Sequence, residues 1–296
     1  MNLKQPINYF FSALLAAALA SCAAPSENKS DNSDEFDEAN ESLKEQVELL
    51  LNNMPSPTEI PYLLQATGAE FNQSLLNERG NVDKYTTRSD KSALNLGVYV
   101  ADIGYLTSYD KTQEAIDYLA ACKALADNLG LVGTFDAELG KQFEANISNK
   151  DSLAHLLDKT IHHAEGYLID DNRNRLSSLI VTGSFIEGLY ISTGLIKSYP
   201  RDILPEDSRN LVLTPLMRVV LEQKKAVSEL VKMLSAVEQN DPVPAILEDL
   251  NALEQTYQQL NIEEQIRNNR ADLVLSDKNL EGITQIVEKI RKQITE

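Results

Sequence analysis

Two stretches of the sequence are apolar on almost every side of a helix, and they constrain the fold more than any other feature. Residues 93–109 contain one charged residue, Asp102, and residues 179–196 contain one, Glu187. A helix that is apolar all round belongs in a protein core or in a membrane. For 179–196 the membrane is disfavoured, because a carboxylate in the middle of a spanning helix costs about 2.5–3.5 kcal/mol on insertion scales. We therefore expect two central apolar helices in the core of one bundle, surrounded by amphipathic helices.

From Phe36 onward the chain follows the 3.6-residue period of amphipathic helices, and the alternation typical of strands is scarce. The sequence has no Trp, 12 Gly and 10 Pro, a composition that favours helices over a β-sandwich. We predict an all-α fold, a multi-helix bundle that forms a single domain over residues 36–296. The predicted helices span residues 36–53, 58–78, 89–109, 111–129, 135–147, 151–171, 174–198, 207–239, 243–260 and 277–295.

In the last third of the chain, alternating spacings of three and four residues predict close packing between helices. Pro242 and Pro244 mark a short turn, which implies that the helices on either side form a C-terminal antiparallel helical hairpin. An intramolecular bundle is the favoured interpretation, and a dimerising coiled coil is the alternative. The positions with this spacing are Leu216, Val220, Gln223, Val227, Leu230, Leu234 and Val237, then Ile246, Leu250, Leu253, Tyr257 and Leu260, then Leu280, Ile283, Val287, Ile290 and Ile294.

The first residues have the plan of a signal peptide, with Lys4 before an apolar run over residues 9–20. The run ends in Leu19-Ala20-Ser21-Cys22, which resembles the lipobox of bacterial lipoproteins. The resemblance implies that a signal peptide over residues 1–21 is removed and that Cys22 is lipidated. The alternative is an ordinary signal peptide or a short transmembrane helix with a chance cysteine, although the run is shorter than the roughly 20 residues that span a bilayer.

Residues 22–35 are polar and acidic, and we expect a disordered acidic tether that lets the domain stand off the membrane. In the sorting rule of diderm bacteria, an Asp after the lipidated cysteine retains a lipoprotein at the inner membrane. Ala23 stands at that position here, and the resemblance therefore implies the outer membrane.

The formal net charge is −18, and so acidic a surface repels nucleic acid and anionic lipid head groups. We expect no nucleic-acid partner.

The only other cysteine is Cys122, so no intramolecular disulfide is expected once Cys22 is lipidated. Cys122 shares an apolar helix face with Leu119, Ala126 and Leu129, which predicts a small buried hydrophobic residue rather than a reactive thiol.

The two apolar helices resemble each other, because residues 94–99 can be laid on residues 180–185 with Gly97 on Gly183. A glycine inside a helix costs roughly 1 kcal/mol, and these glycines make sense where helix backbones approach closely. Both a duplicated unit and chance similarity remain open. Residues 95–105 and 183–190 also resemble segments of uncharacterised all-helical lipoproteins from the Bacteroidota, over much of 85–200. That resemblance implies a lineage and no chemistry.

Asp102 and Glu187 are the first candidate site residues. A carboxylate on an all-apolar helix must be paired, hydrogen-bonded or protonated. One interpretation is a buried ligand or metal site where the two helices meet. The other is a structural network in the core, completed by tyrosine or serine hydroxyls or by an arginine; the arginines considered are Arg88, Arg173 and Arg175.

A second candidate is a helix face that carries His155, Asp158, His162 and Glu165. Imidazole and carboxylate groups at such spacings can bind Zn²⁺ or a similar ion. The string His162-His163-Ala164-Glu165 contains the His-x-x-Glu of imelysin-like periplasmic proteins, but the Gly that precedes the histidine in that family is missing. The alternative is a solvated helix face with incidental histidines.

The sequence contains no Gly-x-Ser-x-Gly elbow, no glycine-rich phosphate loop and no His-Glu-x-x-His. We therefore predict no catalytic residue and no cofactor. The favoured role is non-catalytic binding or scaffolding by a lipid-anchored outer-membrane protein, with the membrane and an envelope protein as its partners. The alternative is a metal- or small-ligand-binding protein that uses the His155/His162 face, and an enzyme is the third choice.

Overall fold

The computed structural model describes residues 31–146, 148–171, 173–199, 206–260 and 277–296. The chain divides into two units, residues 1–38 and 39–296, and only the start of helix α1 (Asp31–Leu51) belongs to the described part of the first. Cys22, the predicted signal peptide and residues 22–30 of the predicted tether lie outside the described residues. Helix α1 begins at Asp31 rather than at residue 36.

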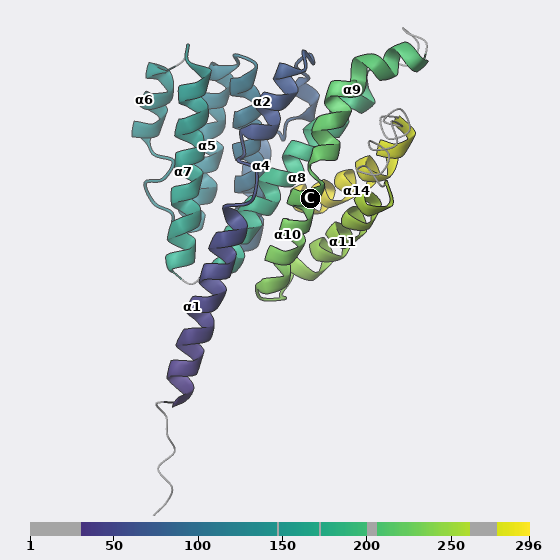
Figure 1. The fold of residues 1–296 in the computed structure, drawn as a ribbon. Helices are drawn as coiled ribbons and strands as arrows, with labels where there is room; N and C mark the ends of the chain where they lie inside the picture. Colours follow the sequence, from purple (N-terminus) through teal and green to yellow (C-terminus); the bar gives the residue numbers. More distant parts are fainter. Residues whose placement is uncertain (1–30, 147, 172, 200–205, 261–276) are drawn as a thin grey trace, which may run out of the picture. The chain divides into compact units, whose positions relative to one another are not determined.

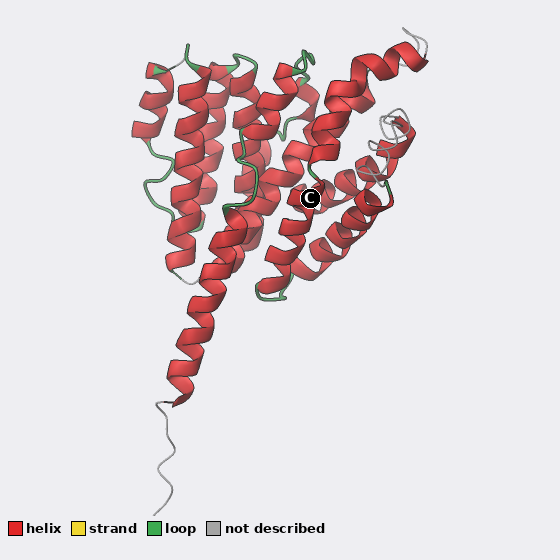
Figure 2. Cartoon of the chain, viewed as in Figure 1, coloured by secondary structure: helices red, strands yellow, loops and turns green. Residues whose placement is uncertain are grey.

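Within residues 39–296 the described chain is helical and contains no strand, which confirms the predicted all-α multi-helix bundle (Figures 1 and 2). After α1, the helices are α2 (Glu59–Ala66), α3 (Val82–Tyr85), α4 (Ser89–Ser108), α5 (Thr112–Asn128), α6 (Ala137–Ala145), α7 (Lys150–Asp170), α8 (Asn174–Ser198), α9 (Glu206–Glu222), α10 (Lys224–Ala236), α11 (Val243–Gln259) and α14 (Asp277–Thr295). Two short 3₁₀ turns, η1 (Gln73–Leu75) and η2 (Arg79–Asn81), lie between α2 and α3.

Helices α4 and α8 are the two central helices, and they form the most extensive helix–helix contact of the bundle. Almost every residue of both is buried. Among the described residues, α8 is the one helix long and apolar enough to cross a membrane, and 89% of its most apolar window is buried inside the protein. Helices α2, α5 and α7 pack on α4, while α7, α9 and α14 pack on α8.

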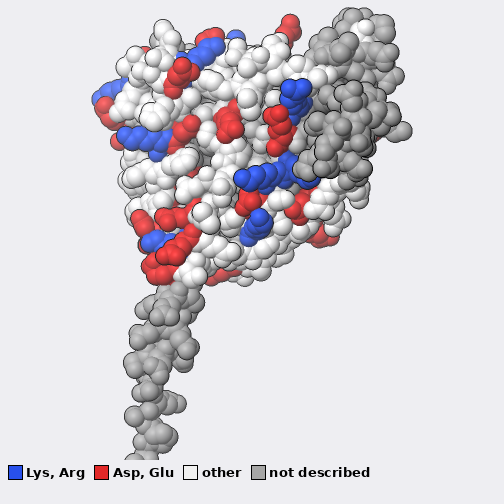
Figure 3. All heavy atoms as spheres, in the orientation of Figure 1, with Lys and Arg blue, Asp and Glu red and all other residues white. Residues whose placement is uncertain are grey.

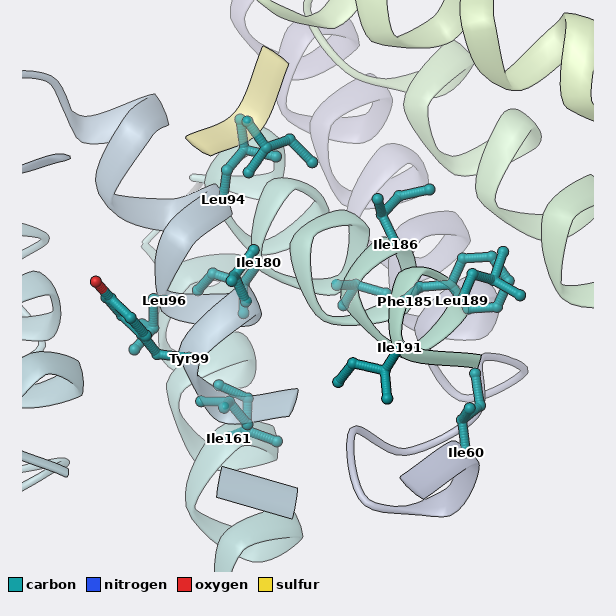
Figure 4. Packing of buried hydrophobic residues seen from close by; sticks show 14 of the residues in the cluster. Ile60, Leu94, Leu96, Tyr99, Ile161, Ile180, Phe185, Ile186, Leu189 and Ile191 are labelled. Atoms are coloured by element: carbon teal, nitrogen blue, oxygen red, sulfur yellow. The ribbon is translucent and has the colours of Figure 1, made fainter. Parts of the chain in front are cut away.

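Backbone lies directly on backbone where α4 and α8 meet. A Cβ atom at position 97 would overlap the carbonyl oxygen of Ile180, and one at position 183 would overlap the carbonyl oxygen of Leu94. The two contacts are reciprocal, as the alignment of Gly97 with Gly183 suggests. Around this contact, side chains from α2, α4, α7 and α8 fill the core; Figure 4 shows Ile60, Leu94, Leu96, Tyr99, Ile161, Ile180, Phe185, Ile186, Leu189 and Ile191 among them.

The helix predicted over 58–78 is wrong in its second half. Helix α2 ends at Ala66, and Gly68 adopts a positive φ of 81° that stops helical continuation. The chain then runs as an irregular segment, residues 69–81, in which Asn72, Leu76 and Glu78 have extended backbone. We call this segment the 69–81 strap, because it crosses α4 and α5 and is bound by their side chains.

The helix predicted over 207–239 is two helices, α9 and α10, which meet at Gln223. Two carbonyl groups at the junction are taken by side chains: Gln223 Nε2 donates to the Val219 carbonyl at 3.1 Å, and the buried Tyr257 hydroxyl donates to the Val220 carbonyl at 2.8 Å. Helices α10 and α11 form the predicted antiparallel hairpin. The heptad positions Val227, Leu230 and Leu234 are buried within the single chain.

Candidate functional site

The site lies where α4 and α8 bring Asp102 and Glu187 together, and neither side chain has exposed surface. Asp102 follows Gly97 by five residues and Glu187 follows Gly183 by four, so each acid lies about one turn beyond the contact between the helix backbones. The two carboxyl groups are within hydrogen-bonding reach of each other. The two acids therefore lie together in the core, between the central helices.

Arg291 of α14 is the cation at this site. Its Nε donates to Glu187 Oε2 at 3.0 Å, and its Nη2 donates to Glu187 Oε1 at 3.2 Å. The guanidinium carbon also lies 4.4 Å from the centre of the Tyr190 ring, a cation–π distance. The arginine side chain is 18% exposed whereas the glutamate is fully covered. This is a bidentate, largely buried ion pair.

Asp102 has a different set of partners. Its Oδ2 accepts the backbone N–H of Asn77 at 3.2 Å, while its Oδ1 has no hydrogen-bond partner as long as both carboxyls are treated as acceptors. Burial and then the negative charge of Glu187 raise the pKa of Asp102 well above its usual range. When Asp102 carries a proton, its carboxyl group can donate a hydrogen bond to Glu187, and two acceptors no longer face each other. The two groups then titrate as one coupled pair.

The 69–81 strap covers this cluster, and α4 and α5 hold it by its backbone. Tyr105 Oη accepts the Asn72 N–H at 2.9 Å, and the hydroxyls of Tyr118 and Tyr99 donate to the carbonyls of Asn77 and Glu78, each at 2.9 Å. Burial raises the pKa of both donating tyrosines, so their hydroxyls stay protonated at neutral pH.

The last turn of α14 is bound to α3 and α4. Three of its carbonyl groups accept hydrogen bonds from Asn95 Nδ2, Tyr85 Oη and Lys91 Nζ; they belong to Ile294 (2.9 Å), Thr295 (3.1 Å) and Glu296 (3.2 Å). The last carbonyls of a helix have no partner within the helix. These side chains therefore cap α14 and place Arg291 over Glu187.

In chemical terms, the cluster comprises two buried carboxyl groups and one guanidinium, and burial raises the pKa of both carboxyl groups above their usual range. It can hold a proton and fix a cationic side chain. A shallow depression with no room for a water molecule lies between the 55–57 loop, Ile60 and α8, and its lining contains none of the three charged residues.

The candidate residues on the histidine face of α7 lie in different environments. His155 and His162 are exposed, and the Asp158 carboxylate accepts the Thr58 hydroxyl at 3.0 Å. Glu165 is buried, and burial followed by the charge of Asp158 raises its pKa to about 8. Within the described ranges, no three His, Cys, Asp or Glu side chains are grouped so as to hold a metal ion.

The arginine partner of Glu187 was not among those considered from the sequence. Arg88 pairs with Asp90 and Asp241, and Arg173 pairs with Asp171. Arg175 donates to the Asp241 carbonyl at 3.5 Å. These three arginines serve other contacts.

A signal for Arg291 is present in the sequence. It lies four residues after Val287 and three before Ile294, so it shares the buried face of α14 with them. Asn77 was missed because the strap around it was predicted to be helical. Comparison of the chain with protein-family models, with curated proteins and with solved structures finds no match.

Proposed function

We propose that this chain is a lipid-anchored protein of the bacterial cell envelope, at the outer membrane, whose helical domain has a non-catalytic binding or scaffolding role. The observation that carries the proposal is the Leu19-Ala20-Ser21-Cys22 string at the end of the apolar run. Small residues before the cysteine suit a signal peptidase, and a thiol there can accept a lipid. A single acyl chain holds a protein only marginally, so stable attachment needs more than one.

Features of residues 39–296 support a scaffolding role. The central helices touch through their backbones at Gly97 and Gly183, which leaves little freedom for one to slide on the other. The buried polar groups bind other segments of the same chain: Arg291 binds Glu187, and the tyrosines bind the 69–81 strap. Such a domain presents a fixed surface to a partner.

Surface charge supports an envelope protein, rather than nucleic acid or an anionic lipid surface, as that partner. The formal net charge is −18. On the face in view in Figure 3, acidic and basic side chains are interspersed and do not gather into one basic patch. An acidic domain on a tether is repelled by anionic head groups, so it remains accessible to other proteins.

Metabolic labelling with a fatty-acid probe tests the anchor. We expect the wild-type chain to be labelled and to partition with membranes, and Cys22→Ala to lose both properties. The matched control is Cys122→Ala, which removes the other, fully buried cysteine and should be labelled like wild type. Equal labelling of Cys22→Ala and wild type would contradict the anchor.

Site-specific photo-crosslinking in intact cells tests the binding role. A crosslinking amino acid is placed at Leu49, Val132 or Tyr167, which are 65%, 82% and 49% exposed and lie on different elements. We expect a discrete adduct with an envelope protein from at least one position. The buried position Leu253 is the control and should give none. No adduct from any exposed position of the anchored protein would count against the proposed role.

A further inference from the structure

We infer that Glu187 and Tyr190 form a binding site for a guanidinium group, and that Arg291 of α14 fills this site within the same chain. The ligand class is an alkylguanidinium, that is, an arginine side chain or a small molecule of the same shape. The inference goes beyond the proposed anchor and binding role and does not depend on either.

The geometry is selective for guanidinium over ammonium. Glu187 and Tyr190 are three residues apart and share a face of α8. The carboxylate receives two parallel N–H groups, Nε at 3.0 Å and Nη2 at 3.2 Å, and the ring lies 4.4 Å from the guanidinium carbon. A lysine ammonium is a point charge that cannot supply this planar pair of donors, and it stacks less well on an aromatic ring.

The burial of Glu187 increases the affinity of the site for a cation. The Glu187 carboxylate is fully buried, so water screens its attraction for the cation only weakly. Removing the cation leaves the carboxylate without a partner. The result is a vacancy, that is, an empty binding site with a defined shape and charge.

The vacancy would be reachable from solvent. Arg291 is 18% exposed and Tyr190 is partly buried, whereas Glu187 is covered completely. The arginine side chain is therefore the cover between the carboxylate and water. Truncating it opens a path to Glu187 along the space that its own methylene groups occupied.

The other ion pairs that hold α14 lack these properties. Lys197 with Glu288 and Lys289 with Asp249 use lysines that are 59% and 61% exposed. Exposed pairs contribute little to stability. The apolar face of α14 packs without regard to charge, so the guanidinium site adds a charge-selective contact to the hydrogen bonds from Asn95 and Tyr85 that hold the end of this helix.

Chemical rescue in the full-length protein tests the site. The urea midpoint of Arg291→Ala is measured with increasing N-ethylguanidinium chloride, at constant ionic strength and below denaturing concentrations. We expect the midpoint to fall below wild type and then to rise toward it with a saturating dependence on the guanidinium compound. Ethylammonium chloride is the control ligand and should restore much less.

Two control proteins, one double variant and the wild type, make the result specific. In Glu187→Gln/Arg291→Ala, N-ethylguanidinium should give no rescue, because the carboxylate is gone. Wild type should not respond, because Arg291 occupies the site. The inference is overturned if the double variant is rescued as well as Arg291→Ala, or if ethylammonium works as well as N-ethylguanidinium.

A second measurement covers the case in which Arg291→Ala does not fold. In ¹⁵N-labelled wild type, the Arg291 Nε–H resonance should exchange slowly with water, and it should become fast in Glu187→Gln while Arg218, an exposed arginine of α9, stays unchanged. Fast exchange of Arg291 Nε–H in wild type, at the same rate as Arg218, would overturn the site.

Discussion

Three of the acidic side chains buried in this bundle, Asp102, Glu165 and Glu187, are each accommodated in a different way. Glu187 is bound by Arg291. Asp102 accepts the Asn77 N–H, and burial and the charge of Glu187 raise its pKa well above its usual range. Glu165 of α7 accepts no hydrogen bond from any described residue, and burial raises its pKa to about 8, so it is mostly protonated at neutral pH. Burial alone therefore does not identify a functional acid; the partner of each group decides its charge.

Glu165→Gln should change the pH dependence of the stability of the protein, because it removes the group whose pKa is raised by burial. The folded-state pKa of about 8 lies above the ordinary value of 4.5, so the folded chain binds more protons than the unfolded chain between these values. The stability from this group is complete below pH 4.5 and is lost as the pH rises through 8. Glutamine cannot ionise. The free energy of unfolding of the variant should therefore rise relative to that of wild type as the pH rises, by on the order of 3–4 kcal/mol from pH 5 to pH 9.

Urea unfolding of wild type and Glu165→Gln at several pH values measures this difference. The matched control is Glu144→Gln, which changes an exposed glutamate of α6 and should leave the difference nearly constant. If Glu165→Gln follows the wild-type curve in parallel over the whole range, Glu165 is solvated and already ionised at neutral pH.

At the scale of elements, the sequence predicted α4 and α8 well because their signals are local. A long apolar helix with one charge needs no knowledge of its neighbours to be placed in the core. The 69–81 strap could not be predicted in the same way. Its path is set in part by the hydroxyls of Tyr99, Tyr105 and Tyr118, which form hydrogen bonds with its backbone, and such bonds leave no pattern in the sequence of the bound segment.

Gly183→Ala should separate the central helices. The new methyl group would overlap the Leu94 carbonyl oxygen, which is backbone and cannot rotate away. Overpacking of a core typically costs about 1–3 kcal/mol, and contact with backbone places this change at or above the upper end. The reciprocal change Gly97→Ala, against Ile180 and Ser184, should cost a similar amount.

The matched control is Gly166→Ala in α7, where a Cβ atom would meet nothing within 4 Å. Alanine is the better helix former, so this variant should gain about 0.5–1 kcal/mol. Urea midpoints of the three variants give the comparison. A cost below about 0.5 kcal/mol for Gly183→Ala, the range of ordinary surface changes, would mean that α4 and α8 do not depend on their close contact.

At the scale of the whole molecule, what the sequence could show of the site depends on sequence separation. Asp102 and Glu187 could be found because each is the one charged residue in its apolar stretch, residues 93–109 and 179–196. Their cation could not, because Arg291 is 104 residues from Glu187 and many arginines are candidates until the helices are packed. The histidine face of α7 shows how little spacing alone decides: His155 and His162 are two turns apart on one helix, but no three metal-ligating side chains are grouped there among the residues that the structure describes.

The same long-range contact should decide whether the bundle unfolds as one unit. Helix α14 is bound to α8 by Arg291 and to α4 by Asn95. Its amide hydrogens should therefore exchange with solvent only when the central helices also open. Native-state hydrogen exchange should therefore give α14 the same opening free energy as α4 and α8, while α6, which packs mainly on α5, exchanges sooner.

Glu187→Gln tests this coupling without deleting volume, because glutamine keeps the shape of the side chain but not its charge. We expect α14 to exchange by its own local opening in this variant, with protection falling more in α14 than in α4 and α8. The protection of α6 serves as the internal reference and should not change. If α4, α8 and α14 instead lose protection by equal amounts, the ion pair contributes only to global stability and α14 is held by its apolar face. That face includes Ile283, Val287 and Ile290, all fully buried, so the comparison separates what apolar burial supplies from what the guanidinium site adds.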